Sequence, residues 1–380
     1  MAKEIKFNWP YTTGKEFQFI EEAIHNRKLS GNGPFTQKCQ SFFQERYGFK
    51  KALLTTSCTD ALEMCAMLAE IKEGDEVIIP SYTFVSTALA FVRQGANVVF
   101  ADSRADHPGI EEESIECLIT PRTKAIVPVH YAGVACDMDK IMTIADKHNL
   151  LVIEDAAQAV ASYYKGRPLG SIGHLAAFSF HETKNISCGE GGLLAINDER
   201  FSKRAEILWE KGTDRAKFFR GEIDKYGWVD LGSSFLPSEI LAAFLYAQLL
   251  ELENIQQERV TIWNRYHSKF SHSLLNSDSI QLPFIPPYAT NNAHMFYIIC
   301  KSLEARNNLI GKLKSQNIHA VFHYLSLHRS TYYTDKYNGS TLEHADRYSE
   351  CLLRLPFYIG LSEIEINLIC NEIIAEQRAK

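Results

Sequence analysis

One lysine lies in a stretch whose composition favours chemistry over a solvated surface role. Lys184 belongs to the segment Ser179–Gly192 (SFHETKNISCGEGG), which is rich in small hydroxyl residues and carries glycines at positions 189, 191 and 192. Glycine lets the backbone approach a bound group closely. Apolar neighbours such as Phe180 and Ile186 disfavour the ammonium form of a lysine, and the free amine can then form a Schiff base with an aldehyde. A surface lysine without a function is the alternative for this residue taken alone.

A carboxylate at the end of a predicted strand supplies a second reactive group. The apolar run Leu150–Ile153 predicts a buried strand, and Glu154 and Asp155 follow it at the carboxyl end. An aspartate that only caps the next helix is the simpler interpretation. However, an aldehyde-binding lysine and a carboxylate that keeps a pyridine nitrogen protonated are the pair that a pyridoxal phosphate (PLP) enzyme needs.

A third stretch could bind a phosphate group. Lys51–Thr55 predicts a short strand, and Ser57, Cys58 and Thr59 precede a predicted helix over Asp60–Ile71. Small residues at a helix N-terminus direct backbone N–H groups and the positive end of the helix dipole toward an anion. Serine and threonine are also the usual N-caps, so a purely structural role stays open for these residues.

Predicted strands and helices alternate through the first half of the chain. These elements must position the lysine, the carboxylate and the phosphate-binding residues. After residue 70 the predicted strands are Glu76–Ile79, Asn97–Ala101, Ala125–Val129, Leu150–Ile153, His174–Phe180 and Gly192–Ile196. The predicted helices are Phe84–Arg93, Ile110–Leu118, Met138–His148 and Asp198–Glu210. This alternation predicts an α/β fold, a mostly parallel sheet with helices on both faces and ligand groups at the carboxyl ends of its strands.

The remaining segments predict an opening helix and a second, smaller domain. Thr13–Lys28 carries apolar residues at helical spacing, and the Gly31-x-Gly33 pair after it lacks the preceding strand and third glycine of a dinucleotide-binding fingerprint. A long helical pattern from Glu239 to about Lys269 would link domains placed at residues 1–255 and 256–380. The smaller α+β domain is predicted from the strands Met295–Ile299 and Ala320–Phe322 and the helices Leu303–Gln316, Leu342–Leu353 and Ser362–Ala379.

Composition narrows the class of protein. The chain has 380 residues and a formal net charge of −6, which argues against a general nucleic-acid or membrane-surface binder. No stretch approaches the ~18 consecutive apolar residues of a membrane span, and the N-terminus lacks the apolar region of a signal peptide. The nine cysteines form no CxxC pair and there is no HExxH motif. We therefore expect a cytoplasmic protein with reduced thiols and no metal site.

Five segments together resemble the DegT/DnrJ/EryC1/StrS family of sugar aminotransferases. They are Thr55–Leu62 (TTSCTDAL), Gly74–Thr87 (GDEVIIPSYTFVST), Lys124–Gly133 (KAIVPVHYAG), Ile153–Gln158 (IEDAAQ) and Ser179–Gly192. The resemblance covers nearly the whole chain, from about Asn8 to Leu361. It implies the PLP-dependent, aspartate-aminotransferase-like fold (type I), with a large PLP-binding domain and a smaller C-terminal domain.

The resemblance also implies roles for individual residues. Lys184 would bind the PLP aldehyde and move protons between substrate and cofactor, and Asp155 would contact the pyridine nitrogen. Gln158 would lie near the ring oxygen, and Phe84 would stack on the ring, although a lone aromatic is more often part of a core. The phosphate would be held by Ser57, Cys58, Thr59 and Ser179. Four more residues are predicted to line the sugar-nucleotide pocket: His294, His323, Tyr324 and His328. A purely structural role is the alternative for each of them.

A homodimer with composite active sites is a further expectation from the resemblance. Family members often carry an asparagine in a Gly-x-Asn-aromatic segment that reaches the phosphate of the neighbouring subunit. Here the segment is Gly232-Ser-Ser234-Phe, so the shorter Ser234 takes that position. Serine is shorter than asparagine but can still donate a hydrogen bond, so Ser234 is a candidate for the contact with the neighbouring cofactor, and the sequence leaves open whether it makes this contact.

The implied reaction uses L-glutamate as the amino donor and a dTDP-linked 4-keto-6-deoxy sugar as the acceptor. Segments such as SFHETKN and EKGTDRAKFFRGEIDKYGW are most similar to the branch that makes dTDP-4-amino-4,6-dideoxygalactose for lipopolysaccharide, as O-antigen or enterobacterial common antigen. The alternatives are a dTDP-4-amino-4,6-dideoxyglucose product, a UDP-linked 4-keto pentose, a 3-keto sugar, a PLP-dependent sugar dehydratase and a non-enzymatic sensor. Lys184 argues against the dehydratase, whose relatives carry histidine there, and the lack of a basic DNA-binding segment argues against the sensor.

Overall fold

The larger sheet has seven strands and is mostly parallel. The computed structural model describes residues 4–273 and 280–378. The strand order is β1-β9-β8-β5-β4-β2-β3, and β9 runs antiparallel to both of its neighbours while the other pairs are parallel. The strands are β1 (Lys51–Thr55), β2 (Glu76–Pro80), β3 (Asn97–Ala101), β4 (Thr123–Ile126), β5 (Leu151–Asp155), β8 (Leu175–Ser179) and β9 (Gly192–Ile196). The predicted α/β fold is confirmed.

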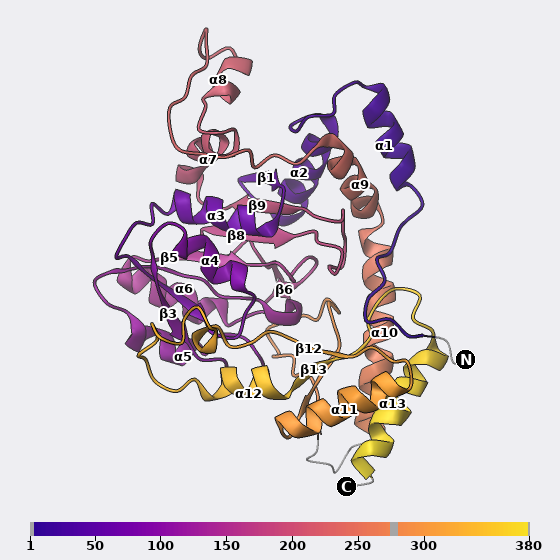
Figure 1. Cartoon of the computed structure of the whole chain (residues 1–380). Coiled ribbons are helices and arrows are strands. Elements are labelled where there is room, and N and C mark those ends of the chain that lie inside the picture. The colour runs from indigo at the N-terminus through magenta and orange to yellow at the C-terminus, as the bar shows by residue number, and fades with distance from the viewer. Residues whose placement is uncertain (1–3, 274–279, 379–380) are drawn as a thin grey trace.

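Helices cover both faces of this sheet, as Figure 1 shows. Successive strand residues enter opposite apolar clusters: Leu54 and Ile78 join one, and Leu53 and Ile79 join the other. The first cluster also contains residues of α2 (Pro34–Tyr47), α6 (Met138–His148) and α9 (Glu239–Leu250). The second contains residues of α3 (Cys58–Leu68), α4 (Val85–Val92) and α7 (Ser202–Trp209). Burial on both faces explains why these strands are continuous apolar runs in the sequence.

The first two helices differ from the sequence prediction. In α1 (Glu16–His25) the predicted apolar face is only partly buried: Ile20 packs against the core, but Phe17 is 84% exposed and Ile24 is 52% exposed, whereas Glu16 is buried. The sequence analysis missed α2 altogether. This helix starts at Gly33-Pro34, with proline at the first turn and no cap from the side chain of its own N-cap residue, so the Gly-x-Gly-Pro composition resembles a loop.

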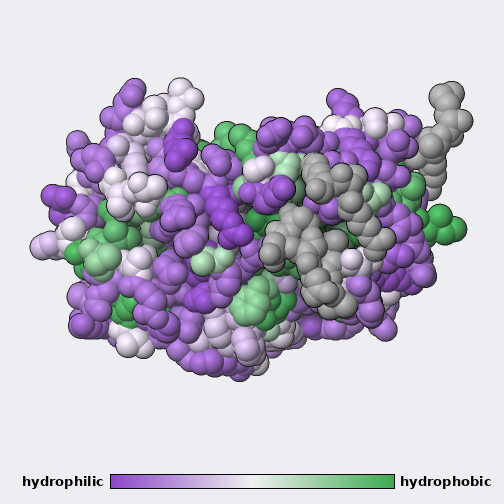
Figure 2. Space-filling model, turned by 90° about the horizontal axis from the view of Figure 1, so that it is seen from below, coloured by the Kyte–Doolittle hydropathy of each residue, from purple (hydrophilic) through white to green (hydrophobic). Residues whose placement is uncertain are grey.

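A second, antiparallel sheet carries the C-terminal third. Its order is β10 (Ile280–Gln281), β11 (Tyr297–Cys300), β13 (Leu352–Arg354) and β12 (Val321–Phe322). Its apolar cluster includes residues of α10 (Leu252–Ser273), α11 (Leu303–Ser315) and α13 (Glu363–Arg378). Figure 2 views the face near α11, α12 and α13, where hydrophobic groups form separate patches in a largely hydrophilic surface.

Two connections in this region correct the predicted helices. The predicted helix from Glu239 to Lys269 is two helices, because the backbone leaves helical geometry at Glu251 between α9 and α10. The predicted helix Leu342–Leu353 ends earlier, as α12 (Glu343–Cys351), and passes directly into β13. The proposed domain division at residue 255 falls inside α10, and Ala379 of the last predicted helix lies outside the described residues.

The remaining elements are short. They are α5 (Glu112–Ile115), α8 (Arg215–Phe219), the hairpin β6 (Tyr163–Tyr164) and β7 (Arg167–Pro168), and the 3₁₀ turns at 116–118, 131–133, 199–201 and 327–329. In Figure 1, α8 lies on an arm that projects from the body beyond α7. Among the helices of the described residues, none has the length and apolar character needed to cross a membrane.

Candidate active site

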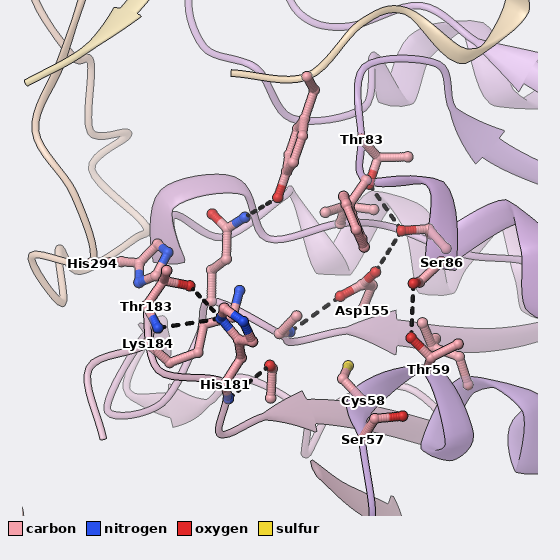
Figure 3. A pocket seen from close by; sticks show the side chains of 18 of the residues that line it. Ser57, Cys58, Thr59, Thr83, Ser86, Asp155, His181, Thr183, Lys184 and His294 are labelled. Atoms are coloured by element: carbon pink, nitrogen blue, oxygen red, sulfur yellow. Dashed lines mark hydrogen bonds between the residues drawn. The ribbon is translucent and has the colours of Figure 1, made fainter. Parts of the chain in front are cut away.

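A cavity of about 380 Å³ lies at the carboxyl ends of the parallel strands (Figure 3). It receives residues from the ends of β5 and β8, from the loop after β2, from the start of α3 and from the second sheet. The predicted site residues that line it are Ser57, Cys58, Thr59, Phe84, Asp155, Gln158, Ser179, Lys184, His294, His323 and Tyr324. The predicted residues that do not line it are Ser234 and His328.

Lys184 reaches this cavity from the loop between β8 and β9. The loop is tied across its base by hydrogen bonds from the Phe180 N–H to the Gly191 carbonyl, 2.8 Å, and from the Glu182 N–H to the Gly189 carbonyl, 2.9 Å. Burial lowers the pKa of the Lys184 amine to about 8. Among the described residues, no carboxylate forms an ion pair with it. An amine of this pKa is a far better nucleophile near neutral pH than an ordinary lysine.

Asp155 is the last residue of β5 and is 5% exposed. Its Oδ2 accepts a hydrogen bond from the Thr87 hydroxyl at 2.7 Å, and its Oδ1 accepts one from the Ala157 N–H at 3.1 Å. Burial raises the pKa of this carboxyl, against the effect of both hydrogen bonds. Figure 3 shows Thr83, Ser86 and Thr59 on one side of Asp155 and Lys184 on the other.

The adjacent Glu154 points to the opposite face of the sheet, as strand alternation requires. Its carboxylate accepts hydrogen bonds from the backbone N–H groups of Gly170, Ile172 and Gly173 at 2.6–2.7 Å and lies 2.9 Å from Nε2 of His130. Although burial alone would raise the pKa of Glu154, these partners lower it overall. Glu154 therefore secures the end of β5, and Asp155 is the carboxylate that faces the cavity.

The start of α3 forms one end of the cavity. Ser57 is its N-cap, and the serine Oγ accepts the Asp60 N–H at 3.0 Å. The hydroxyl oxygens of Thr59 and Ser86 lie 2.8 Å apart and join α3 to α4. A Cβ on Gly192 would lie 2.4 Å from the carbonyl carbon and oxygen of Ser57, so β9 can pass here only with a glycine. Hydroxyls and free N–H groups at this helix end suit a phosphate.

Aromatic and amide groups surround the middle of the cavity. Phe84 is 54% exposed, so it is not a core residue, and its ring lies 5.8 Å from that of Tyr324. Gln158 is fixed in orientation: its Oε1 accepts the Ala132 N–H at 2.6 Å and its Nε2 donates to the Tyr324 hydroxyl at 3.0 Å. Tyr324 has a φ of +54°, a backbone conformation that side-chain-bearing residues rarely adopt.

Two of the three predicted histidines line the cavity. Nδ1 of His294 lies 2.9 Å from Oδ1 of Asn185, and Nδ1 of His323 lies 2.6 Å from the Tyr131 hydroxyl. Burial lowers the pKa of both imidazoles well below the ordinary range, so both are neutral. His328 is elsewhere, 2.7 Å from the Ser81 hydroxyl, as part of the packing between the two sheets.

Ser234 lies outside this chain's own cavity. It is exposed and forms an isolated β-bridge with Glu210. The same segment carries Trp228, 82% exposed, and Leu231, 65% exposed. Its position leaves the hydroxyl open to a second molecule.

Arg354 lines the cavity and was missed by the sequence analysis. It ends β13, its guanidinium lies 4.7 Å from the centre of the Phe7 ring, and its Nε has no hydrogen-bond partner among the described residues. Burial lowers the pKa of this arginine. The signal in the sequence was a single charged residue in the apolar run Leu352–Leu355. A half-buried guanidinium that faces a cavity and has no carboxylate partner among the described residues is suited to bind an anionic ligand.

These groups suit two ligands. One is a cofactor with an aldehyde, a pyridine nitrogen and a phosphate, and the other is a substrate with a carboxylate. The amine of Lys184 can bind the aldehyde, Asp155 can pair with a protonated ring nitrogen, and the start of α3 can hold the phosphate. Arg354 remains for the carboxylate. The residues of the cavity therefore fit PLP.

Comparisons with known proteins agree with this chemistry. The model of the DegT/DnrJ/EryC1/StrS aminotransferase family matches residues 10–374. The spore coat polysaccharide biosynthesis protein SpsC of Bacillus subtilis is 33% identical over 378 residues, covering 97% of this chain and 96% of SpsC. Spr1654 from Streptococcus pneumoniae, solved in its PLP-form, is 26% identical with a TM-score of 0.91, covering 99% of both chains. The aminotransferase TlmJ from Streptoalloteichus hindustanus is 26% identical with a TM-score of 0.90, covering 99% of this chain and 100% of TlmJ.

The family match spans almost the whole chain, and the structural match extends over both sheets. PLP is therefore the cofactor, and the reaction class is amino transfer with a sugar substrate. This chain belongs to the DegT/DnrJ/EryC1/StrS family of PLP-dependent sugar aminotransferases.

Proposed function

We propose that the protein transfers the amino group of L-glutamate to C4 of dTDP-4-keto-6-deoxyglucose, giving dTDP-4-amino-4,6-dideoxygalactose and 2-oxoglutarate. The observation that carries the proposal is that Lys184, Asp155 and Arg354 line one cavity. An amine of lowered pKa, a buried carboxylate and a guanidinium without a carboxylate partner are what a PLP-dependent reaction of an amino acid requires.

The proposed roles follow from position. PLP, when bound, supplies an electron sink for the negative charge that develops at the substrate carbon. With PLP bound, Lys184 Nζ would take up and return the proton of that carbon, because its pKa of about 8 lets the amine both take and give a proton near neutral pH. Asp155 would keep the pyridine nitrogen protonated.

The other cofactor contacts are assigned in the same way. Phe84 covers one face of the ring from the start of α4, and Gln158 lies near the ring oxygen. The phosphate is held by the residues at the start of α3 together with the hydroxyl at the end of β8; these are Ser57, Cys58, Thr59 and Ser179. This arrangement neutralises the phosphate with backbone N–H groups and the helix dipole.

Arg354 is proposed to bind a carboxylate of the amino donor. The arginine lies on the second sheet, on the same cavity as Lys184, and has no carboxylate partner among the described residues. A guanidinium and a carboxylate form two parallel hydrogen bonds, which fixes the orientation as well as the affinity. L-glutamate supplies that carboxylate, whereas the proposed sugar substrate has no carboxylate and carries its negative charge on the two phosphates of dTDP.

The sugar nucleotide is proposed to occupy the side of the cavity formed by His294, His323 and Tyr324. Both imidazoles are neutral, so each offers a hydrogen-bond acceptor or donor to a hydroxyl without repelling a cationic cofactor ring. The proposed product is used for a cell-surface glycan such as an O-antigen or enterobacterial common antigen.

A homodimer is part of the proposal. Ser234 is exposed, lies outside its own cavity and belongs to a segment with exposed Trp228 and Leu231. A second copy packed on this segment would cover these apolar groups and bring the Ser234 hydroxyl to the neighbouring phosphate site. Two-fold dimers place the same surface on both subunits and so create two equal sites.

The experiment that tests the reaction follows the visible absorbance of the PLP-loaded protein. Addition of L-glutamate should remove the cofactor's visible band, and dTDP-4-keto-6-deoxyglucose should restore it, with neither change in Lys184→Ala. NMR of the product then identifies the configuration at C4. A response to glutamate without a response to this sugar would replace the substrate by another keto sugar, and no response to glutamate would contradict the amino donor.

A further inference from the structure

Two threonine hydroxyls lie in series behind the carboxylate of Asp155. Thr83 is in the loop between β2 and α4, and Thr87 is in the first turn of α4. Both are buried, with exposures of 2% and 1%. Their hydroxyl oxygens are 2.9 Å apart, and the Thr87 hydroxyl donates to Asp155 Oδ2 at 2.7 Å (Figure 3).

The direction of these hydrogen bonds follows from proton counting. A threonine hydroxyl has one proton. Thr87 gives its proton to Asp155, so Thr83 must donate to Thr87. The Ala157 N–H donates to the other carboxylate oxygen at 3.1 Å. Every hydrogen bond that Asp155 receives in this arrangement therefore favours its ionised form.

The position of Thr83 and Thr87 allows them to stabilise the negative charge of Asp155. Asp155 is buried, and burial opposes the charge that a protonated pyridine ring needs opposite it. Thr83 and Thr87 come from the β2–α4 connection and reach Asp155 at the end of β5, across β4 in the strand order. The connection thus supplies a hydrogen-bond donor that orients the carboxylate and favours its charged form.

We propose that Thr83 and Thr87 are positioning residues that keep Asp155 ionised and oriented toward the pyridine nitrogen of PLP. Thr87 acts directly on the carboxylate, and Thr83 acts through Thr87 by polarising its hydroxyl. This inference rests on the proposed role of Asp155.

The test measures binding and spectroscopy of the cofactor, with no substrate present. Thr87→Val keeps the shape of the side chain and removes the hydroxyl, Thr87→Ser keeps the hydroxyl, and Thr83→Val removes only the outer hydroxyl. Asp155→Ala reports the role of the carboxylate itself. Thr143→Val, on the exposed side of α6, is the control for the same chemical change elsewhere. For each variant, the Kd of PLP for the apoprotein and the circular dichroism of the bound cofactor are recorded.

We expect Thr87→Val to raise the Kd about tenfold, since one hydrogen bond to a charged group is lost, and to alter the cofactor's dichroism. Thr83→Val should change the Kd and the dichroism in the same direction as Thr87→Val, but by a smaller factor. Thr87→Ser should restore both values to near the wild type, and Thr143→Val should leave them unchanged. If Thr87→Val does not fold, as judged by thermal unfolding, Thr83→Val alone decides, because it leaves the bond between Thr87 and Asp155 in place.

Three results would overturn the inference or its basis. The role of the threonines would be contradicted if Thr87→Val had the Kd and dichroism of the wild type while Asp155→Ala bound PLP weakly and lost the dichroism. The proposed role of Asp155 would then stand. A Thr87→Ser variant as impaired as Thr87→Val would show that the methyl packing matters and the hydroxyl does not. Wild-type behaviour of Asp155→Ala would remove the proposed role of Asp155 and this inference with it.

Discussion

Lys184 and Asp155 line one cavity from neighbouring parallel strands, and among the described residues they form no ion pair with each other. Asp155 ends β5 opposite Ala177 of β8, and Lys184 follows β8 on the loop to β9. Asp155 is instead bonded to Thr87 and to the backbone of Ala157. Since the amine and the carboxylate do not neutralise each other by direct contact, each remains available to a different part of one ligand.

The lowered pKa of Lys184 predicts how its reaction with PLP depends on pH. Burial brings this pKa from 10.5 to about 8. The fraction of free amine, and so the rate at which the apoprotein binds PLP covalently, should rise about tenfold per pH unit below pH 8 and level off above it. Stopped-flow absorbance measures this rate, and Lys184→Ala supplies the background. A rate that still rises tenfold per unit up to pH 10 would contradict the lowered pKa.

Arg354→Leu should impair one half of the reaction only. Loss of the carboxylate contact should weaken L-glutamate binding on the order of a hundredfold, as for other charge-assisted pairs in buried sites. The reaction of the amine-loaded enzyme with the keto sugar should change much less, because the sugar has no carboxylate. Single-turnover absorbance measures both halves separately.

Arg265→Leu is the matched control, because Arg265 is exposed on α10, away from the cavity. Both of its half-reactions should equal those of the wild type. Equal losses in the two half-reactions of Arg354→Leu would contradict a role of Arg354 that is specific to the carboxylate of the amino donor.

Gly192→Ala should weaken PLP binding. An added Cβ would lie 2.4 Å from the Ser57 carbonyl carbon and oxygen and 2.5 Å from the Cys58 nitrogen, so the start of α3 must move. We expect a Kd for PLP at least about tenfold higher and a loss of about 1–3 kcal/mol in the free energy of unfolding. Gly311→Ala, in α11 with open space around its Cβ, should be neutral or stabilising by up to about 1 kcal/mol. Equal behaviour of the two variants would contradict the close approach.

Glu239→Gln should destabilise the fold without touching the cavity. The fully buried carboxylate of Glu239 accepts the backbone N–H groups of Gly33, Phe35 and Thr36 at 2.7–3.0 Å, and so caps the start of α2. An amide cannot accept all of these donors, and we expect a loss of about 2–4 kcal/mol in the free energy of unfolding, measured by urea denaturation.

The control for this change is Glu253→Gln on α10. Its side chain is 73% exposed and pairs with Arg46, so its replacement should alter the free energy of unfolding by less than about 0.5 kcal/mol. A Glu239→Gln variant as stable as this control would show that water or neighbouring groups satisfy the start of α2.

The sequence by itself determined the elements whose burial produces an apolar pattern in their own residues. The strands of the large sheet are covered on both faces, so they are apolar runs, and β3 and β9 lie at the predicted residues. Lys184 and Asp155 were also found, because each follows such a run within a few residues. PLP was predicted from this pair and from the resemblance, and the comparisons confirm it as the cofactor.

Only the tertiary structure decided the features that depend on distant partners. The break at Glu251 has no glycine or proline to mark it; α9 packs with α1 and α2, whereas α10 packs with the second sheet. β13 continues the apolar pattern of α12 and becomes a strand because β11 and β12 lie on either side of it. That pairing brings Arg354 to the cavity, while His328, four residues beyond Tyr324, is turned to Ser81. The spacing of apolar residues along the chain indicates which residues are buried. Which of the buried residues face the ligand depends on how the two sheets pack against each other.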